Sequence, residues 1–230
     1  MPSRRLLGVL LVVAALAVPA QVAAKSLGSV TSTSLGAWVL AGGTTVPTVV
    51  AWTPFTGANG TSLPGQTLNG TGTWASDSGT WTISSNRAGT TSAGLGNLDI
   101  HAGTQNATVV VTLIIGASAN AGVVALRNNS NVALFATYSL ASGGTIQLNK
   151  FNGSTSNLST VTGVGTPSTA EFKLDATTNT IKISFNGTQV MSYALSAGDI
   201  TALKAAANDR FGIFADNDAV TRFDDFHVDT

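Results

Sequence analysis

The sequence contains no cysteine, and charged residues make up only 10% of its 230 positions. Without cysteine the chain forms no disulfide, no cysteine-ligated metal site and no thiol nucleophile. A domain without disulfides needs a large hydrophobic core of its own, and a chain of this length can enclose one. The lack of cysteine therefore favours one well-packed domain.

An excess of positive charge is absent as well. The 11 Lys and Arg residues balance 11 Asp and Glu residues, so the formal net charge is +0. Proteins that bind nucleic acids or anionic membranes usually concentrate basic side chains on one surface. We therefore expect no nucleic-acid partner, and solubility must come from the many Thr, Ser, Asn and Gly residues.

Catalytic carboxylates are scarce. Glu171 is the only glutamate, whereas a glycosidase needs two carboxyl groups beside the scissile bond. Glu171 alternates with Lys173 and Asp175 on a polar strand face, close to where Lys182 of the next strand should lie. This pattern favours a solvated charge pair over a catalytic role.

Asp99 and His101 form a second polar pair. They flank Ile100, so both should project from one face of a strand. Such a pair could orient a general base or supply two metal ligands. The neighbouring sequence offers neither a nucleophile nor a third ligand, so the pattern does not predict an active site.

The N-terminal region has the pattern of an export signal. Arg4 and Arg5 precede an apolar run from Leu6 to Val18, and small residues at 22–24 offer a cleavage site. The run is shorter than the roughly 20 residues that a membrane-spanning helix needs. We expect residues 1–24 to be a signal peptide, the mature protein to be secreted or held at the cell surface, and no membrane span to remain after cleavage.

The remainder divides into a lead-in and one domain. Residues 25–50 are rich in Ser, Thr and Gly, whereas residues 51–230 alternate apolar and polar side chains between turn residues. This period-two pattern is typical of sandwiches and barrels. The expected fold class is all-β, with strands at 106–115, 121–127, 131–140, 145–151, 170–175, 180–185, 188–195, 211–215 and 219–228.

Two local signals complete this prediction. Asn186-Gly187 favours a type I′ hairpin, because both residues tolerate positive φ. One short helix is expected near residues 197–207, with Ser196 or Asp199 as its N-cap.

The turn after Arg127 decides which sheet face that residue occupies. A three-residue turn at 128–130 would place Val124 and Leu126 in the core beside Val132 and Leu134. Arg127 would then lie on the opposite face.

That opposite face would also carry Phe135, Gln147 and Asn149. Saccharides bind to aromatic rings and planar polar groups, so Arg127, Phe135, Gln147 and Asn149 are candidate ligand-binding residues. The alternative interpretation is that this is the partly exposed side of an ordinary sheet.

A series of short motifs spans residues 51–230. They are Trp52-Thr-Pro-Phe55-Thr-Gly57, Gly60–Leu63, Trp74, Gly79–Ile83, Asn86–Ala88, Ala121–Arg127 with Asn131, Asn186-Gly187, Phe211–Ile213 and Arg222–Phe226. In this order they resemble the concanavalin A-like lectin/glucanase superfamily, in its laminin-G-like branch of secreted bacterial and phage-associated proteins. The resemblance implies a jelly-roll β-sandwich of two antiparallel sheets, with Trp74 and Trp81 in the core.

The resemblance leaves activity open, because members bind carbohydrates, act as adhesion modules or hydrolyse glucans. The Glu-x-Asp-x-x-Glu motif of the glucanases is absent here, so we expect no enzyme activity and no required cofactor. Members often hold a structural calcium through an aspartate on the final strand and backbone carbonyls near the domain start, and Asp224 matches that aspartate. Alternatively, Asp224 satisfies its own backbone in a turn.

Three functions are compatible with these patterns. The first is a non-catalytic carbohydrate-binding or adhesion module whose partner is a polysaccharide or cell-surface glycan. The second is a structural subunit of a surface layer, filament or matrix, self-associating through residues 25–50, with the Val-rich segment 46–50 pairing with a neighbour's sheet edge. A glycoside hydrolase ranks last.

Overall fold

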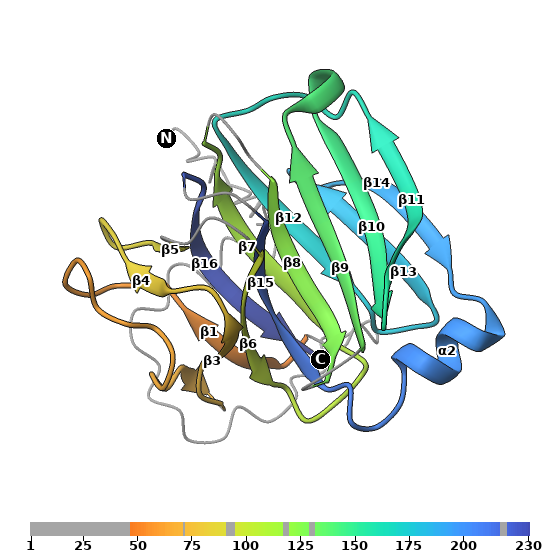
Figure 1. Cartoon of the computed structure of the whole chain (residues 1–230), viewed down its shortest axis with the longest axis horizontal. Coiled ribbons are helices and arrows are strands. Elements are labelled where there is room, and N and C mark those ends of the chain that lie inside the picture. The colour runs from red at the N-terminus through yellow and green to blue at the C-terminus, as the bar shows by residue number, and fades with distance from the viewer. Residues whose placement is uncertain (1–46, 71, 91–94, 117–119, 129–131, 217–219) are drawn as a thin grey trace, which may run out of the picture. The chain divides into compact units, whose positions relative to one another are not determined.

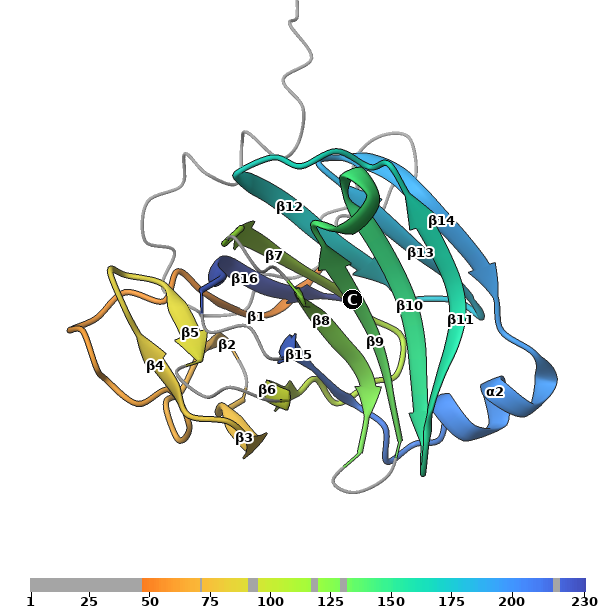
Figure 2. The same ribbon diagram turned by 45° about the horizontal axis from the view of Figure 1, so that its top comes forward.

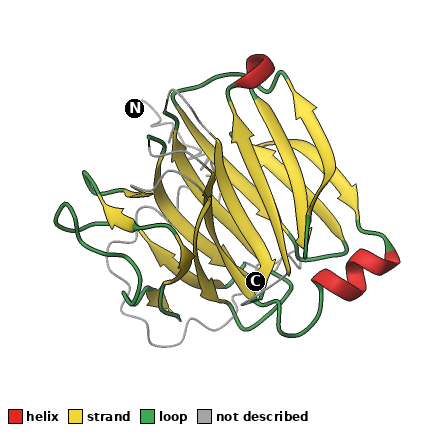
Figure 3. Cartoon of the chain, in the orientation of Figure 1, coloured by secondary structure: helices red, strands yellow, loops and turns green. Residues whose placement is uncertain are grey.

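The computed structural model describes residues 47–70, 72–90, 95–116, 120–128, 132–216 and 220–230. They form two antiparallel sheets packed face to face, with one short α-helix at the rim (Figure 1). Strands form both layers and loops connect them at the ends (Figure 3). The expected all-β sandwich with one short helix is confirmed.

The first sheet has the strand order β14-β13-β12-β7-β16-β1-β2, and β5 pairs with both β16 and β4. Its strands are β1 (Val49–Thr53), β2 (Asn69–Gly70), β4 (Trp81–Ile83), β5 (Ala88–Thr90), β7 (Thr108–Ile114), β12 (Thr169–Asp175), β13 (Thr180–Phe185), β14 (Thr188–Ala194) and β16 (Arg222–Asp229).

The second sheet has the order β11-β10-β9-β8-β15-β6-β3 and lies in front of the first in Figure 2. Its strands are β3 (Ala75–Ser78), β6 (Leu95–His101), β8 (Asn120–Arg127), β9 (Val132–Ser139), β10 (Thr145–Asn152), β11 (Thr155–Thr162) and β15 (Arg210–Asp216). A 3₁₀ turn, η1 (Ala141–Gly143), connects β9 to β10.

The core lies between the sheets and follows the alternation in the sequence. On β7 the inward side chains Val109, Val111 and Leu113 are fully buried. The same alternation buries one side chain in two along β12 and β13. Burial of these apolar faces is the main stabilising contribution to such a sandwich.

Aromatic side chains fill the end of the core near β1 and β16. The rings of Phe55 and Trp74 stack with centroids 5.8 Å apart, and Phe226 lies 4.8 Å from Trp74. Trp81 packs against Phe223 at 5.7 Å. The core positions expected for Trp74 and Trp81 are confirmed.

The two local signals are also confirmed. Asn186 and Gly187 have φ values of 51° and 76°, as a type I′ turn between β13 and β14 requires. The helix α2 spans Ala197–Leu203, and Ser196 caps it by accepting a hydrogen bond from the Asp199 backbone N–H.

The expected register between β8 and β9 is wrong for Val124. Val124 pairs with Phe135 on the face turned away from the core, while Ala125 pairs with Leu134. Leu126 is nevertheless buried, because it has a φ of 51° and two β8 residues, Ala125 and Leu126, oppose one residue of β15 at this point. This β-bulge, and not the expected register between β8 and β9, places Arg127 on the outward face of the sheet. Residues 129–131 of the proposed turn lie outside the described residues.

Two further expectations need correction. β1 begins at Val49, inside the expected lead-in, and lies between β16 and β2. The strand β2 pairs with β1 only at Ala51 and Trp52, so pairing of Val49 and Val50 with a neighbouring sheet stays a prediction, and Val46 lies outside the described residues. Lys182 pairs with Asp175 rather than with Glu171, which lies opposite Thr112.

The strand β11 was not expected, because its sequence is largely Thr, Ser and Asn. It is an edge strand whose only neighbour in the sheet is β10. A half-exposed edge strand buries few apolar groups, so its period-two signal is weak. No helix within the described ranges is long and apolar enough to cross a membrane.

Gly212 is required because β15 and β6 approach closely at this position. A Cβ added there would lie 2.1 Å from the Leu98 carbonyl oxygen and 2.6 Å from the Asp99 Cα atom.

We expect Gly212→Ala to lower the free energy of unfolding by about 1–3 kcal/mol, measured by urea-induced unfolding. The matched control is Gly198→Ala in α2, where no atom lies closer than 4.0 Å. It should change stability slightly in the favourable direction, and equal effects of the two substitutions would contradict this explanation.

Candidate functional site

The candidate site lies on the outward face of the second sheet, which is the side turned away from the core. Pairing of the strands places its side chains in two adjacent rows. The first row contains Gln147, Thr137, Gly122, Phe214 and Asn97, on β10, β9, β8, β15 and β6 in that order. The second row contains Asn149, Phe135, Val124, Gly212 and Asp99 on the same strands.

Glycine in the middle of this face lets two aromatic rings meet. Phe135 on β9 and Phe214 on β15 are separated by β8, where the first row has Gly122. Their ring centroids are 4.9 Å apart and their planes differ by 26°, so the rings stack above β8. This pair forms an apolar wall on an otherwise polar face.

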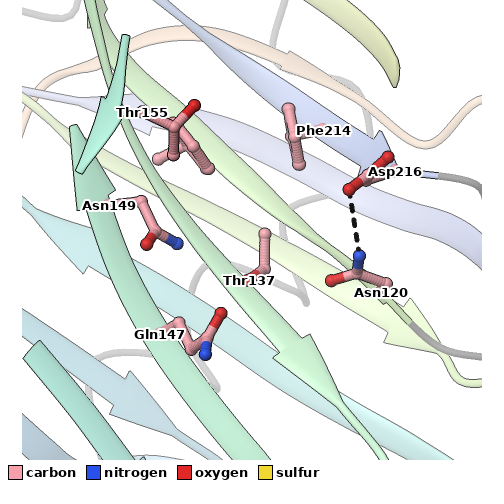
Figure 4. Close-up of a pocket in the computed structure, with 8 residues that line it drawn as sticks. Asn120, Thr137, Gln147, Asn149, Thr155, Phe214 and Asp216 are labelled. Atoms are coloured by element: carbon pink, nitrogen blue, oxygen red, sulfur yellow. Dashed lines mark hydrogen bonds between the residues drawn. The ribbon is translucent and has the colours of Figure 1, made fainter. Parts of the chain in front are cut away.

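A small cavity of about 180 Å³ lies beside this wall. Amides, hydroxyls and one carboxylate surround it, contributed by β8, β9, β10, β11 and β15 (Figure 4). Its lining residues are Asn120, Phe135, Thr137, Gln147, Asn149, Thr155, Phe214 and Asp216.

A hydrogen bond from Asn157 fixes the orientation of the Asn149 amide. Asn149 is only 7% exposed, and its Oδ1 accepts a hydrogen bond from Asn157 Nδ2 at 3.0 Å. The Asn149 Nδ2 donor therefore points into the cavity (Figure 4), where no described residue accepts from it. The side chain of Gln147 is exposed next to it and also makes no hydrogen bond to the described residues.

Asp216 provides the opposite wall. Asn120 Nδ2 donates to Asp216 Oδ2 at 3.3 Å, as the dashed line in Figure 4 shows. The other carboxylate oxygen accepts no hydrogen bond from the described residues. The cavity therefore presents amide donors on β10 and a carboxylate acceptor on β15, with Thr137 between them.

An ion cluster occupies the other end of the outward face. Asp99 is fully buried and contacts Arg127 Nη1 and, at 3.3 Å, Arg210 Nη1. Asn97 Nδ2 donates to the same carboxylate at 3.1 Å. The cluster ties together β6, β8 and β15.

His101 and Asp209 extend this cluster toward solvent. Arg210 Nε donates to His101 Nε2 at 3.1 Å, so the proton of the neutral imidazole is on Nδ1. That Nδ1 lies 2.9 Å from Asp209 Oδ1 and donates to it. Asp99 and His101 do share one strand face, as the sequence predicts, but their partners are guanidinium groups and a carboxylate rather than a nucleophile.

Burial shifts the proton affinities in this cluster. It raises the pKa of Asp99 to about 6, although the Arg210 charge and the Asn97 hydrogen bond oppose the rise. Burial also lowers the pKa of Arg127 to about 10, and repulsion from Arg210 acts in the same direction. Contact with Arg127 further favours the charged form of Asp99.

The four ligand-binding candidates from the sequence lie partly in the cavity and partly in the ion cluster. Phe135, Gln147 and Asn149 line the cavity, whereas Arg127 is held by Asp99. Sequence reasoning missed Asn120, Thr137, Thr155, Phe214 and Asp216. The alternation of β15 around inward-facing Phe211, Ile213 and Ala215 could have identified Phe214 and Asp216 as outward-facing.

Asp224 is half-buried at a β-bulge in β16. Its Oδ1 accepts a hydrogen bond from the Asp225 backbone N–H at 2.9 Å. Within the described ranges, no three His, Asp or Glu side chains form a group that could hold a metal. The described side chains therefore do not fit a calcium site by themselves, and the calcium at Asp224 stays a prediction.

Comparison with known proteins establishes the fold. No protein-family model and no curated protein sequence matches the chain. Among solved structures, the carbohydrate-binding module CBM66 from Bacillus subtilis is similar, with a TM-score of 0.55 and 18% identity over 68% of this chain and 95% of that one. SCLam, a non-specific endo-β-1,3(4)-glucanase from family GH16, matches with a TM-score of 0.53 and 10% identity over 80% of this chain and 91% of that one.

These similarities confirm the jelly-roll sandwich fold. At 18% and 10% sequence identity, the two similar structures support the fold assignment and no assignment of function. One of the two similar structures is a binding module and the other a hydrolase. The chemistry of the site must therefore decide the function.

Replacing the buried carboxylate tests the ion cluster. Asp99→Asn keeps the side-chain shape but leaves the Arg127 and Arg210 guanidiniums without their counter-charge. We expect the free energy of unfolding to fall by about 3–5 kcal/mol, as for other broken buried ion pairs. Arg127→Met should cost less, because Asp99 keeps Arg210 and Asn97. Denaturant unfolding of both variants checks this order, and a larger loss for Arg127→Met would contradict it.

Removal of divalent metal tests the calcium hypothesis. If Asp224 holds a structural calcium, EDTA should lower the Tm of the wild-type protein, and Asp224→Asn should abolish the difference between calcium and EDTA. Differential scanning calorimetry measures both. An identical wild-type Tm in calcium and in EDTA would refute the hypothesis.

Proposed function

We propose that this chain is an exported, non-catalytic carbohydrate-binding module whose ligand occupies the cavity on the outward face of the second sheet. The observation that carries the proposal is the Asn149 amide. It is nine-tenths buried, held in one orientation by Asn157, and directs an unpartnered donor into the cavity. This donor belongs to a largely buried side chain but is open to the cavity, so a ligand hydroxyl can accept a hydrogen bond from it.

The other lining groups suit the same class of ligand. Sugar hydroxyls both donate and accept hydrogen bonds, and the cavity offers amides on one side and a carboxylate on the other. Sugar rings also have apolar C–H faces, which pack on aromatic side chains such as the Phe135–Phe214 pair. The cavity is small, so it would hold about one sugar ring of a longer chain.

The spacing of carboxylates supports binding without hydrolysis. Glycosidases place two carboxyl groups about 5–9.5 Å apart. Asp216 is the only carboxylate in the described lining of the cavity. Asp99 on β6 lies opposite Gly212 on β15, and Gly212 is four residues from Asp216. The two carboxylates are therefore separated by about 13 Å along the strands. The Asp99 oxygens are also already bound by Arg127, Arg210 and Asn97.

The proposal that the protein acts outside the cell is supported by the sequence of residues 1–24. A positive pair, an apolar run and small residues follow each other there in the order of an export signal. A polysaccharide or cell-surface glycan is accordingly the proposed partner.

A glycan array followed by calorimetric titration of the bound glycan tests the proposal. Gln147→Ala/Asn149→Ala removes two amide groups from the outward face and leaves the buried apolar side chains of β10, Ile146 and Leu148, unchanged, so the fold should persist. Loss of two hydrogen bonds should weaken binding by about ten- to a hundredfold. The matched control is Gln189→Ala, an exposed glutamine on β14 of the first sheet, which should bind like wild type. Absence of any bound glycan, or unchanged affinity of the double variant, would defeat the proposal.

A further inference from the structure

The cavity contains one ionisable group. Of the described residues that line it, only Asp216 carries a charge, and no lysine, arginine or histidine is among them. One of its oxygens accepts from Asn120, and the other accepts from no described residue. A ligand in the cavity therefore meets a negative group that lacks a positive partner there.

The cations elsewhere on the outward face do not offset this charge. Arg210 is six residues from Asp216 on β15, or about 20 Å along the strand. Arg127 lies opposite Arg210, two residues from the Gly212–Val124 pair beside Phe135, or about 7 Å along the strand. Both guanidiniums are also largely buried and contact the Asp99 carboxylate, which offsets their charge locally.

The ion cluster is also neutral as a whole. The formal charges of Asp99 and Asp209 balance those of Arg127 and Arg210, and His101 accepts a hydrogen bond from Arg210 Nε. It presents no net positive field to an anion in the cavity. The local electrostatics of the site are therefore set by Asp216.

From this arrangement we infer, on the basis of the proposed function, that the cavity selects uncharged, hydroxyl-bearing sugars and rejects acidic ones such as uronates. A neutral sugar places one hydroxyl against the Asp216 carboxylate, to which it donates, and another hydroxyl against Asn149 Nδ2, from which it accepts. A uronate would add a carboxylate to a cavity that already has an unpaired one. Asp216 is then the residue that determines charge specificity.

The experiment compares glycans that differ only in a carboxylate at C6. β-1,4-Mannan with β-1,4-polymannuronate and β-1,4-glucan with β-1,4-polyglucuronate are suitable pairs because the two members of each pair share their linkage, and each is titrated at low and high salt. Wild type should bind at least one neutral member, with its acidic counterpart about tenfold weaker or more. In Asp216→Asn that ratio should shrink by about tenfold, because the repulsion is removed while the side-chain shape is kept.

Asp225→Asn is the matched control. It removes one carboxylate from the first sheet, at an exposed position with a φ of 47° that asparagine adopts readily. It should leave the ratio of neutral to acidic binding unchanged. Wild-type protein gives a second readout that needs no variant, since added salt should improve binding of the acidic member relative to the neutral one.

The possible failures are distinguishable. If no glycan of either kind binds, the proposed function itself is wrong. If an acidic glycan binds as tightly as its neutral counterpart, the site binds carbohydrate but the charge selectivity is wrong. If Asp216→Asn leaves the ratio unchanged, Asp216 does not set it and the inference is overturned.

Discussion

The structure depends on one constraint: each strand must turn one side of its alternating side chains into the space between the sheets. Leu98 and Ile100 on β6, and Ile213 on β15, satisfy it by complete burial. Because side chains alternate with period two, burying these residues turns Asp99, Gly212 and Phe214 to the other face. The residues of the candidate site are therefore positioned by the core, although none of them belongs to it.

The outward face is not uniform along the strands. At one end the Asp99 carboxylate holds two guanidiniums and an amide, and this cluster links three neighbouring strands. At the other end Asp216 and the β10 amides surround a cavity with unoccupied hydrogen-bonding groups. Saturated polar groups at the first end are typical of a structural role, whereas unsaturated ones at the second are typical of a ligand site.

The jelly-roll sandwich is shared by binding modules and hydrolases, so the placement of carboxylates matters more than the fold. The two carboxylates of this face are separated along β6 and β15, and the more buried one is fully engaged by basic side chains. That separation favours recognition over bond cleavage. It also leaves Asp216 as a single negative group, which gives the cavity a preference for the charge of its ligand.

The sequence by itself determined the fold class, the inward residues of the regular strands, the Asn186-Gly187 hairpin and the Ser196 cap, because these follow from short-range periodicity and backbone preferences. It also indicated Phe135, Gln147 and Asn149 as neighbours, since they occur on consecutive strands whose pairing follows from their apolar faces. Only the tertiary structure decided the bulge at Leu126, the pairing of Arg127 with Asp99, and the approach of Phe214 and Asp216 to the cavity. These contacts join β15 and β6 to strands far away in the sequence, and a one-residue bulge reverses every side chain after it. The periodicity of side chains within one strand predicts neither the contacts between distant strands nor the position of a β-bulge.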